Sequence, residues 1–264
     1  EDLGSARQID HVLQGEDSQE AEDVLMAFVQ ALAEMHCATA GSTDRYHEIR
    51  SALGPRVVRD HVRRIRTFED ALTEQGITAP GLSLELERCA EALANPGPFL
   101  AYTHGDPCPD NCLVLDGKVW LLDFEWAEVR HALIDGVFPW IHFPSCWCVN
   151  RLPGDLPERL LNSYRDRLVE GIPEASDDDL FGVGLLAASV AGFVNNFGGV
   201  FEEDRKWGIS TVRQRCLMRV GILERTAESY GYPAIADASA RLSERIHELW
   251  SDVEPMPIYP AFRI

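Results

Sequence analysis

The sequence predicts a mainly α-helical protein with one small β-hairpin embedded in it. Apolar residues recur at helical spacing through most of the chain, and an Asp-Gly pair between two short apolar runs is typical of a tight hairpin turn. With 264 residues, of which 45% are hydrophobic, the chain can fold around one large core or two unequal ones. We therefore expect a folded globular protein.

Three helices are expected before the hairpin. The first begins at Ser18 and carries its apolar residues on one face; they are Val24, Leu25, Phe28, Leu32 and Met35. A second helix is expected between Pro55 and Gly76, where apolar residues again recur at helical spacing and the glycine provides a stop. The third covers residues 84–94, with Ser83 as its N-cap and a Pro- and Gly-rich segment after it.

The hairpin follows a short extended segment, residues 99–103, and a polar loop. Its strands are expected at Cys112–Leu115 and Val119–Leu122, joined through Asp116 and Gly117. After the hairpin the spacing is helical again. Further helices are predicted over residues 156–169, 179–201, 209–229 and 234–250.

The charge balance excludes one class of partner. Lys and Arg number 24 against 43 Asp and Glu, for a formal net charge of -19, and such an acidic chain would repel a nucleic-acid backbone. An acidic surface suits a cationic ligand, although it serves plain solubility equally well. We expect no nucleic-acid partner.

Nothing in the sequence indicates a membrane segment or an export signal. The longest apolar run, Leu180–Val194, is shorter than the ~20 residues that a membrane-spanning helix needs, so we interpret it as a buried helix. The N-terminal residues contain neither the basic nor the apolar segment of a signal peptide. We therefore expect a cytoplasmic protein with no membrane partner.

The seven cysteines are expected to be reduced thiols. Their number is odd and their spacing forms no regular disulfide framework. A less favoured alternative is a zinc site built from Cys108, Cys112, Cys146 and Cys148, whose spacings differ from those of ordinary four-thiolate sites.

Two polar motifs around the hairpin indicate the chemistry. The loop before it reads His104-Gly-Asp106-Pro-Cys-Pro-Asp-Asn111, and the hairpin is followed by Asp123-Phe-Glu125. Phosphoryl transfer requires a carboxylate that orients or deprotonates the attacking hydroxyl, and oxygen ligands for the magnesium ion on the phosphates. Asp106, as an exposed loop carboxylate, suits the first role, and Asn111 and Asp123 suit the second. Any surface turn uses these residue types, but two motifs in this order and spacing make a chance loop the weaker interpretation.

On these motifs the sequence resembles the aminoglycoside phosphotransferase family, whose members have the protein-kinase-like fold and carry H-G-D-x-x-x-x-N followed by D-x-E. Residues 31–40 resemble the first large-lobe helix of that family, and the resemblance extends from residue 1 to about residue 153. It implies that residues 1–264 form a single C-terminal lobe of this fold, mainly α with a small β-hairpin. The implied segments are an interlobe junction (1–17), a helical segment (18–98), the catalytic loop and metal-binding hairpin (99–130) and a helical acceptor-side region (131–264).

The resemblance also implies a role for each motif residue. Asp106 would be the catalytic base, and Asn111 and Asp123 would hold Mg²⁺. His104 would brace the loop without reacting. Asp135 resembles the buried family aspartate that accepts hydrogen bonds from the catalytic-loop backbone, which implies a structural role.

Three further residues have weaker assignments. Glu125 either lies near the second metal position or faces solvent. Asp2 and Leu3 resemble the junction segment on the adenine side of the nucleotide.

Two acidic triplets lie in the region that, by the same resemblance, binds the acceptor. Residues 177–179 are expected to cap a helix. Glu202, Glu203 and Asp204 are expected either to close a helix or to face the amino groups of a cationic acceptor.

Part of a kinase-like site has no counterpart in the sequence. Such a site uses a glycine-rich loop over the phosphates and a lysine on a strand. The lysines here are Lys118 and Lys206, both after the catalytic loop. We expect that the N-terminal lobe is absent, through truncation or in a naturally one-lobed protein, and that the full-length parent is the active species.

The sequence thus predicts an O-phosphotransferase that uses ATP (or GTP) and Mg²⁺ and acts on a small hydroxylated molecule, an aminoglycoside or another natural product. Its expected ligands are a nucleotide and a small-molecule hydroxyl acceptor. Two alternatives stay open: a kinase-like scaffold or partner protein that has lost catalysis, and a kinase acting on Ser or Thr of a peptide. A homo-oligomer or a complex with a partner protein is also open.

Overall fold

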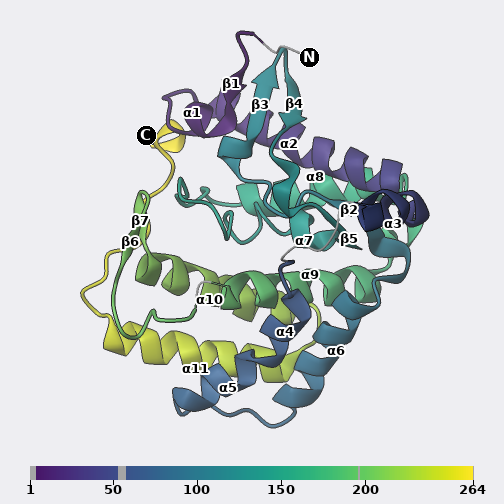
Figure 1. The fold of residues 1–264 in the computed structure, drawn as a ribbon. Coiled ribbons are helices and arrows are strands. Elements are labelled where there is room, and N and C mark those ends of the chain that lie inside the picture. The colour runs from purple at the N-terminus through teal and green to yellow at the C-terminus, as the bar shows by residue number, and fades with distance from the viewer. Residues whose placement is uncertain (1–3, 53–57, 196, 264) are drawn as a thin grey trace. The chain divides into compact units, whose positions relative to one another are not determined.

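The computed structural model describes residues 4–52, 58–195 and 197–263, which form a mainly helical fold with three small antiparallel sheets (Figure 1). This architecture agrees with the fold class that the sequence predicts. The chain divides into two compact units. The first comprises Glu1–Arg59, Pro96–Ser176 and Ile258–Ile264, and the second comprises Asp60–Asn95 and Asp177–Pro257. The assignment of residues 1–264 to one kinase-like lobe stays a prediction.

The first unit contains five α-helices among its described residues: α1 (Ile9–Leu13), α2 (Ser18–Thr39), α3 (Thr43–Ala52), α7 (Leu133–Gly136) and α8 (Leu156–Val169). Its described residues also form short 3-10 helices, which are η1 (Gly97–Phe99), η2 (Pro109–Asn111), η3 (Phe124–Trp126), η4 (Pro173–Ser176) and η5 (Pro260–Phe262). Helix α2 begins where the sequence predicts, because the Asp17 carboxylate accepts a hydrogen bond from the backbone N–H of Glu20 (3.0 Å). The apolar face of α2 is buried and lies along α8, whose bounds are those predicted (Figure 1).

Three strands form the sheet that contains the predicted hairpin. Strands β3 (Cys112–Leu115) and β4 (Lys118–Leu121) pair antiparallel. Asp116 and Gly117 close the turn with φ angles of 50° and 72°, the left-handed backbone that favours an Asp-Gly pair. Strand β1 (Arg7–Gln8) extends the sheet in the order β1-β3-β4 (Figure 1). The hairpin prediction is confirmed.

A second antiparallel pair lies at the base of the polar loop. Strand β2 (Leu100–Thr103) pairs along its length with β5 (Glu128–His131). Thr103, the last residue before the polar loop, lies opposite Glu128, the first residue after the segment that contains Asp123. The two motif-bearing segments therefore meet at the same end of this strand pair.

The second unit contains six α-helices and one strand pair among its described residues. They are α4 (His61–Arg66), α5 (Phe68–Glu74), α6 (Leu82–Ala94), α9 (Asp178–Val194), α10 (Val212–Ser229), α11 (Pro233–Leu249), β6 (Lys206–Trp207) and β7 (Ser210–Thr211). Helix α9 contains most of the long apolar run and is buried over nearly all its length, as predicted. Asp177 caps it by accepting hydrogen bonds from the N–H groups of Asp179 (2.9 Å) and Leu180 (3.0 Å).

The single helix predicted between Pro55 and Gly76 is wrong. Pro55 lies outside the described residues, and the segment after it forms two short helices, α4 and α5, that meet at Thr67. The Asp60 carboxylate caps α4, which fixes its start, and the Thr67 hydroxyl donates to the carbonyl oxygen of Arg64 (2.9 Å) where α4 ends. Apolar periodicity continued across the break and therefore did not reveal it.

The predicted N-cap of the third helix is also wrong. Helix α6 begins at Leu82, after Gly81 in left-handed conformation (φ 87°). The Ser83 hydroxyl donates instead to the Glu69 carboxylate (2.6 and 2.8 Å). The helix starts earlier than predicted because glycine supplies the change in backbone direction.

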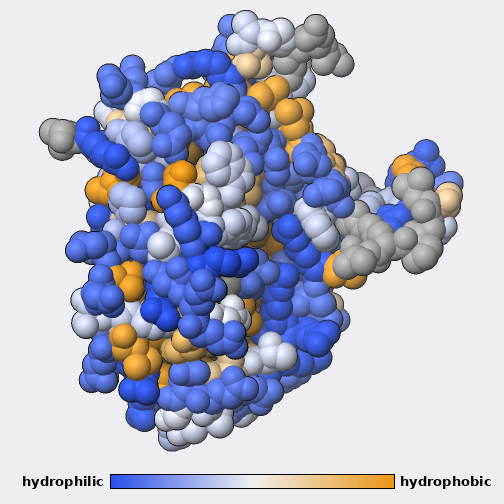
Figure 2. Space-filling model, turned by 60° about the vertical axis from the view of Figure 1, so that its left-hand side comes forward, coloured by the Kyte–Doolittle hydropathy of each residue, from blue (hydrophilic) through white to orange (hydrophobic). Residues whose placement is uncertain are grey.

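The face shown in Figure 2 is mostly hydrophilic, in keeping with the net charge of -19, and apolar residues are scattered among the polar ones there. Among the described residues, no single helix is both long and apolar enough to cross a membrane; only the bent pair of α2 and α3 meets the length and composition criteria, and it does so as a pair.

Candidate active site

The polar loop between β2 and β3 is closed by hydrogen bonds through Asn111. Asn111 donates from Nδ2 to the carbonyl oxygen of Asp106 (3.0 Å), and its own carbonyl oxygen accepts from the N–H of Leu122 (2.9 Å). Leu122 directly precedes Asp123 in the sequence. These bonds therefore join the two polar motifs across the base of the hairpin.

His104 is buried and connects the same two segments. Its Nε2 donates to the carbonyl oxygen of Leu122 (2.6 Å), and its Nδ1 accepts from the backbone N–H of Asp106 (3.4 Å). Because a carbonyl oxygen can only accept, Nε2 of His104 carries a proton. The ring packs against Phe124, with centroids 4.6 Å apart. Both ring nitrogens are thus used in holding the backbone.

Asp135 is fully buried in α7 and holds the start of the loop. Its Oδ2 accepts from the N–H of His104 (2.6 Å) and its Oδ1 from the N–H of Gly105 (2.9 Å), while Nε2 of His36 lies 3.3 Å from Oδ2. Burial by itself raises the pKa of the Asp135 carboxyl, but the hydrogen bond and charge of His36 outweigh it, so that the pKa is lowered. A charged carboxylate therefore fixes the two N–H groups that precede Asp106.

Asp123 and Glu125 are exposed after the hairpin. Asp123 precedes η3 in left-handed backbone (φ 59°), a conformation that Asp tolerates better than most residues. The Oδ1 atom of Asn111 can still serve as a metal ligand, because the hydrogen bond to Asp106 uses only Nδ2 of the side-chain amide. Within the described part of the chain, no group of three His, Cys, Asp or Glu side chains could hold a metal ion. A hard cation would thus depend on the Asn111 and Asp123 oxygens together with oxygens from outside the protein.

The Asp106 side chain is 18% exposed, so the expectation of an exposed loop carboxylate is wrong. Its Oδ1 accepts a hydrogen bond from the Ser145 hydroxyl, and its Oδ2 lies 3.4 Å from Nη2 of Arg59. Arg59 lies 47 residues before Asp106 and Ser145 lies 39 residues after it. Neither residue belongs to a motif, and no local pattern marks them, so sequence reasoning missed both.

A family model described as the phosphotransferase enzyme family (APH) matches residues 5–172. This match covers more than half of the chain. The chain belongs to the phosphotransferase enzyme family. The family resemblance is thereby confirmed, and the matched region extends past residue 153. A comparison with curated proteins finds no match.

In this phosphotransferase-family chain, the expectation that all cysteines are reduced is wrong. Cys108 and Cys146 form a disulfide, with Cα atoms 5.6 Å apart and a sequence separation of 38. The chain after α7 returns to the polar loop, a long-range approach that sequence spacing does not reveal. Sγ of Cys108 lies 3.3 Å from Oδ1 of Asp106. A disulfide sulfur has no proton to donate, so this approach is a packing contact.

The alternative zinc site of four thiolates is wrong for the same reason. Two of its proposed ligands are joined to each other, and Cys112 and Cys148 remain as buried free thiols. Burial raises the pKa of Cys148 to about 12 and raises that of Cys112 well above its ordinary value. Both thiols are therefore protonated in the metal-free protein, and the disulfide alone rules out the set of four thiolates.

The acidic triplet expected to contact the acceptor lies in the second unit. Glu202 and Glu203 are exposed. The Asp204 carboxylate accepts a hydrogen bond from the N–H of Arg213 (3.0 Å) at the start of α10, which is a structural contact. Acceptor binding by this triplet stays a prediction. Asp2 and Leu3, the residues predicted near adenine, lie outside the described residues.

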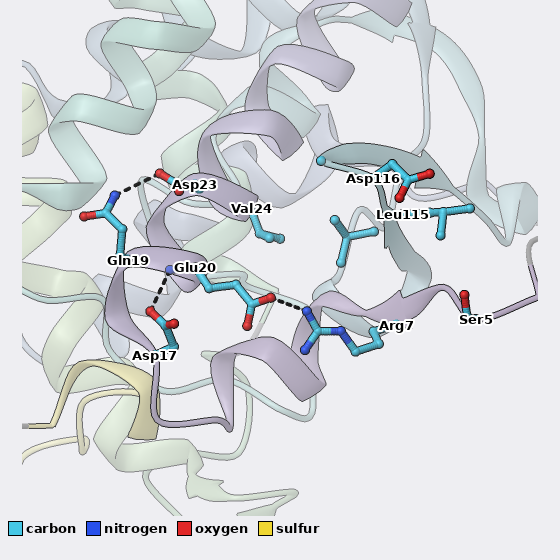
Figure 3. A pocket seen from close by; sticks show the side chains of 11 residues that line it. Ser5, Arg7, Asp17, Gln19, Glu20, Asp23, Val24, Leu115 and Asp116 are labelled. Carbon is cyan, nitrogen blue, oxygen red and sulfur yellow. Dashed lines mark hydrogen bonds and ion pairs between the residues drawn. The ribbon is translucent and has the colours of Figure 1, made fainter.

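An open hollow of about 670 Å³ lies beside the hairpin in the first unit (Figure 3). Asp17, the N-cap of α2, and Glu20 and Asp23 of α2 line one side, and residues 114–117 line the other. Arg7 forms an ion pair with Glu20 within it (Figure 3). None of the motif residues Asp106, Asn111 and Asp123 lines this hollow, so it is separate from the polar loop.

Proposed function

We propose that this chain contains the catalytic loop and metal-binding segment of an O-phosphotransferase that uses ATP (or GTP) and Mg²⁺ and acts on a hydroxyl group of a small molecule. The observation that supports it most strongly is the environment of Asp106, a carboxylate whose backbone is fixed through Asn111 and Asp135 in a member of the phosphotransferase family. The net charge of -19 suits an acceptor with amino groups, such as an aminoglycoside.

Asp106 would act as the base. A carboxylate offers about four lone-pair sites, and one donor on each oxygen leaves room for the acceptor hydroxyl. As the hydroxyl proton passes to Asp106, a bond forms between the acceptor oxygen and the γ-phosphorus. The bond between that phosphorus and the β–γ bridging oxygen breaks, and its electron pair leaves with the nucleoside diphosphate.

Asn111 and Asp123 would hold Mg²⁺ through side-chain oxygens, the ligands that this cation prefers. When bound, the cation neutralises charge on the phosphates. Glu125 is close enough in sequence to extend this set, or it stays in solvent. His104 and Asp135 would act on the loop backbone and would not touch the substrate.

Asp106→Asn tests the proposal. The amide keeps the shape of the side chain and a hydrogen-bond acceptor for Ser145, but it cannot take up a proton. In the full-length protein, assayed with Mg·ATP and a panel of aminoglycosides, we expect kcat to fall by about 10³-fold while thermal unfolding is unchanged. A variant that forms phosphorylated product at the wild-type rate would show that Asp106 is not the base.

The metal ligands have a matched control in the hairpin. Asp123→Asn should raise the Mg²⁺ concentration needed for half-maximal activity, because a charged ligand is lost. Asp116→Asn should not, since Asn-Gly forms the same turn as Asp-Gly and Asp116 lies at the hairpin tip. Equal Mg²⁺ dependence of the two variants would contradict the role of Asp123.

The alternative functions give different results in the same assays. A scaffold that has lost catalysis would form no product and bind Mg·ATP weakly or not at all. A kinase acting on peptides would phosphorylate a Ser/Thr peptide library and leave the aminoglycosides unchanged.

A further inference from the structure

Two side chains from outside the family motifs hold the Asp106 carboxylate, one on each oxygen. The Ser145 hydroxyl donates to Oδ1, and Nη2 of Arg59 lies 3.4 Å from Oδ2. We propose that Arg59 and Ser145 are positioning residues of the phosphoryl-transfer reaction, which fix the orientation of the base. This inference rests on the proposed function of Asp106.

Arg59 is itself held by more than the carboxylate. Its Nη1 donates to the carbonyl oxygen of Gly105 (2.7 Å), and its Cζ lies 4.3 Å from the ring centroid of Trp126. The Arg59 side chain, 19% exposed, thus contacts Asp106, Gly105 and Trp126. A planar guanidinium can make these three contacts together, whereas a lysine ammonium is a single point charge.

Ser145 is fixed by its neighbours in the sequence. Cys146 is bonded covalently to Cys108, and Nε1 of Trp147 donates to Oδ2 of Asp110 (2.7 Å). Three consecutive residues therefore contact alternate residues of the polar loop. Ser145 contacts Asp106, Cys146 is bonded to Cys108, and Trp147 contacts Asp110. The hydroxyl on Oδ1 is presented by a backbone that is held on its C-terminal side by both a covalent bond and a hydrogen bond.

The two contacts on the Asp106 carboxylate have a consequence for the chemical step. A general base must be correctly oriented toward the hydroxyl that it deprotonates. Arg59 and Ser145 contact the two oxygens of this carboxylate and so limit its rotation. Loss of either residue should therefore slow the chemical step and leave substrate binding unchanged.

The test uses the full-length protein with Mg·ATP, an aminoglycoside panel and, as a second acceptor, water through ATP hydrolysis. Arg59→Gln should lower kcat by about 10–100-fold, with KM values for nucleotide and acceptor unchanged. Arg59→Lys should recover part of the loss. Ser145→Ala should lower kcat by about tenfold, and Ser145→Thr, which keeps the hydroxyl, should restore it.

Matched controls separate positioning from general damage. Arg66→Gln removes an exposed arginine that pairs with Glu87, and Ser176→Ala removes an exposed hydroxyl on η4; both should keep the wild-type kcat. In the Asp106→Asn background, neither Arg59→Gln nor Ser145→Ala should lower the residual rate further, because both act through Asp106. Thermal unfolding of each variant shows whether it is folded.

The outcomes distinguish this inference from the proposed function. If Asp106→Asn is inactive while Arg59→Gln and Ser145→Ala keep the wild-type kcat, positioning is wrong and the proposed function stands. A raised KM at unchanged kcat would place Arg59 in substrate binding and overturn positioning. If Asp106→Asn is as active as wild type, or if wild type transfers phosphate to no acceptor, both proposals fail.

Discussion

Gly105 occupies a position in the polar loop where a side chain has no space. Its φ is 82°, and a Cβ atom there would clash with the Trp126 carbonyl oxygen and with Nη2 of Arg130. Arg130 donates from Nη2 to that same carbonyl oxygen (2.7 Å). The loop therefore passes directly against the segment after Asp123, and only glycine permits this close approach.

We expect Gly105→Ala to lower the free energy of unfolding by about 3 kcal/mol, from backbone strain and overlap together. Gly117→Ala is the matched control, since Gly117 also has a positive φ (72°) but no atom within 4 Å of a new Cβ. That variant should lose only about 1 kcal/mol, from strain alone. Chemical denaturation measures both, and equal losses would show that the approach at Gly105 is looser than described.

At the scale of residues, a single sequence can predict site residues whose spacing along the chain forms a motif. The sequence predicts Asp106, Asn111 and Asp123 as site residues because chemistry and family motif fix their separations along the chain, and their roles stay predictions. It does not predict Arg59 or Ser145 beside Asp106, because each reaches that carboxylate only through the fold. Contacts between residues so distant in sequence depend on tertiary packing, which a single sequence does not display.

At the scale of elements, Glu85 of α6 caps the N-terminus of helix α11. Its carboxylate, 9% exposed, accepts hydrogen bonds from the N–H groups of Ala234 (3.2 Å) and Ile235 (2.8 Å) in the first turn of α11. These N–H groups have no partner within their own helix, and the positive end of the helix dipole favours a carboxylate there. Glu85 therefore joins α6 to α11 through a cap supplied from a distant segment.

Glu85→Ala should lower the free energy of unfolding by about 2 kcal/mol, because two buried N–H groups lose their acceptor. The matched control is Glu87→Ala on the same helix. Glu87 is exposed and pairs with Arg66 (2.8 Å), and exposed ion pairs contribute little, so no measurable loss is expected. Urea denaturation of the two variants decides it; similar midpoints would contradict the capping role.

Helices and strands could be predicted where the burial of one face, or a turn, leaves a pattern of residue types in the sequence. Helices α2 and α8 and the β3–β4 hairpin match the prediction because an apolar stripe or a turn pair marks them. Helix α3 was missed, since none of its residues is buried and no stripe exists. The break at Thr67 was missed for the opposite reason, because apolar spacing runs through it.

At the scale of the whole molecule, the Cys108–Cys146 disulfide is the covalent constraint that sequence could not predict. It closes a loop with a sequence separation of 38, for which the chain-entropy model gives about 4 kcal/mol of stabilisation. The expectation of a cytoplasmic location and the presence of a disulfide oppose each other, because reducing compartments disfavour such bonds. Location stays a prediction.

Reduction with dithiothreitol should lower the thermal unfolding midpoint of the wild type, and Cys146→Ser should show no such response. Cys216→Ala, which removes a buried free thiol, is the control and should respond like wild type. Thiol titration of the denatured protein should find five thiols before reduction and seven after it. Seven thiols before reduction would show that the bond is not formed.

The division of the chain into two compact units was likewise beyond sequence reasoning. Each unit is assembled from segments that alternate along the chain, so no composition shift or linker marks a boundary. The helical periodicity is the same before and after each point where the chain passes from one unit to the other. Periodicity predicts helices, but it does not show which helices pack together.

The position of the disulfide also affects how kinetic data on this protein should be compared. Sγ of Cys108 touches the Asp106 carboxylate, and Cys146 is adjacent to Ser145, which donates a hydrogen bond to that carboxylate. Samples purified with and without a thiol reagent would therefore contain the same polypeptide with differently restrained polar loops. Rate constants from two laboratories are comparable only once the oxidation state of each sample has been assayed.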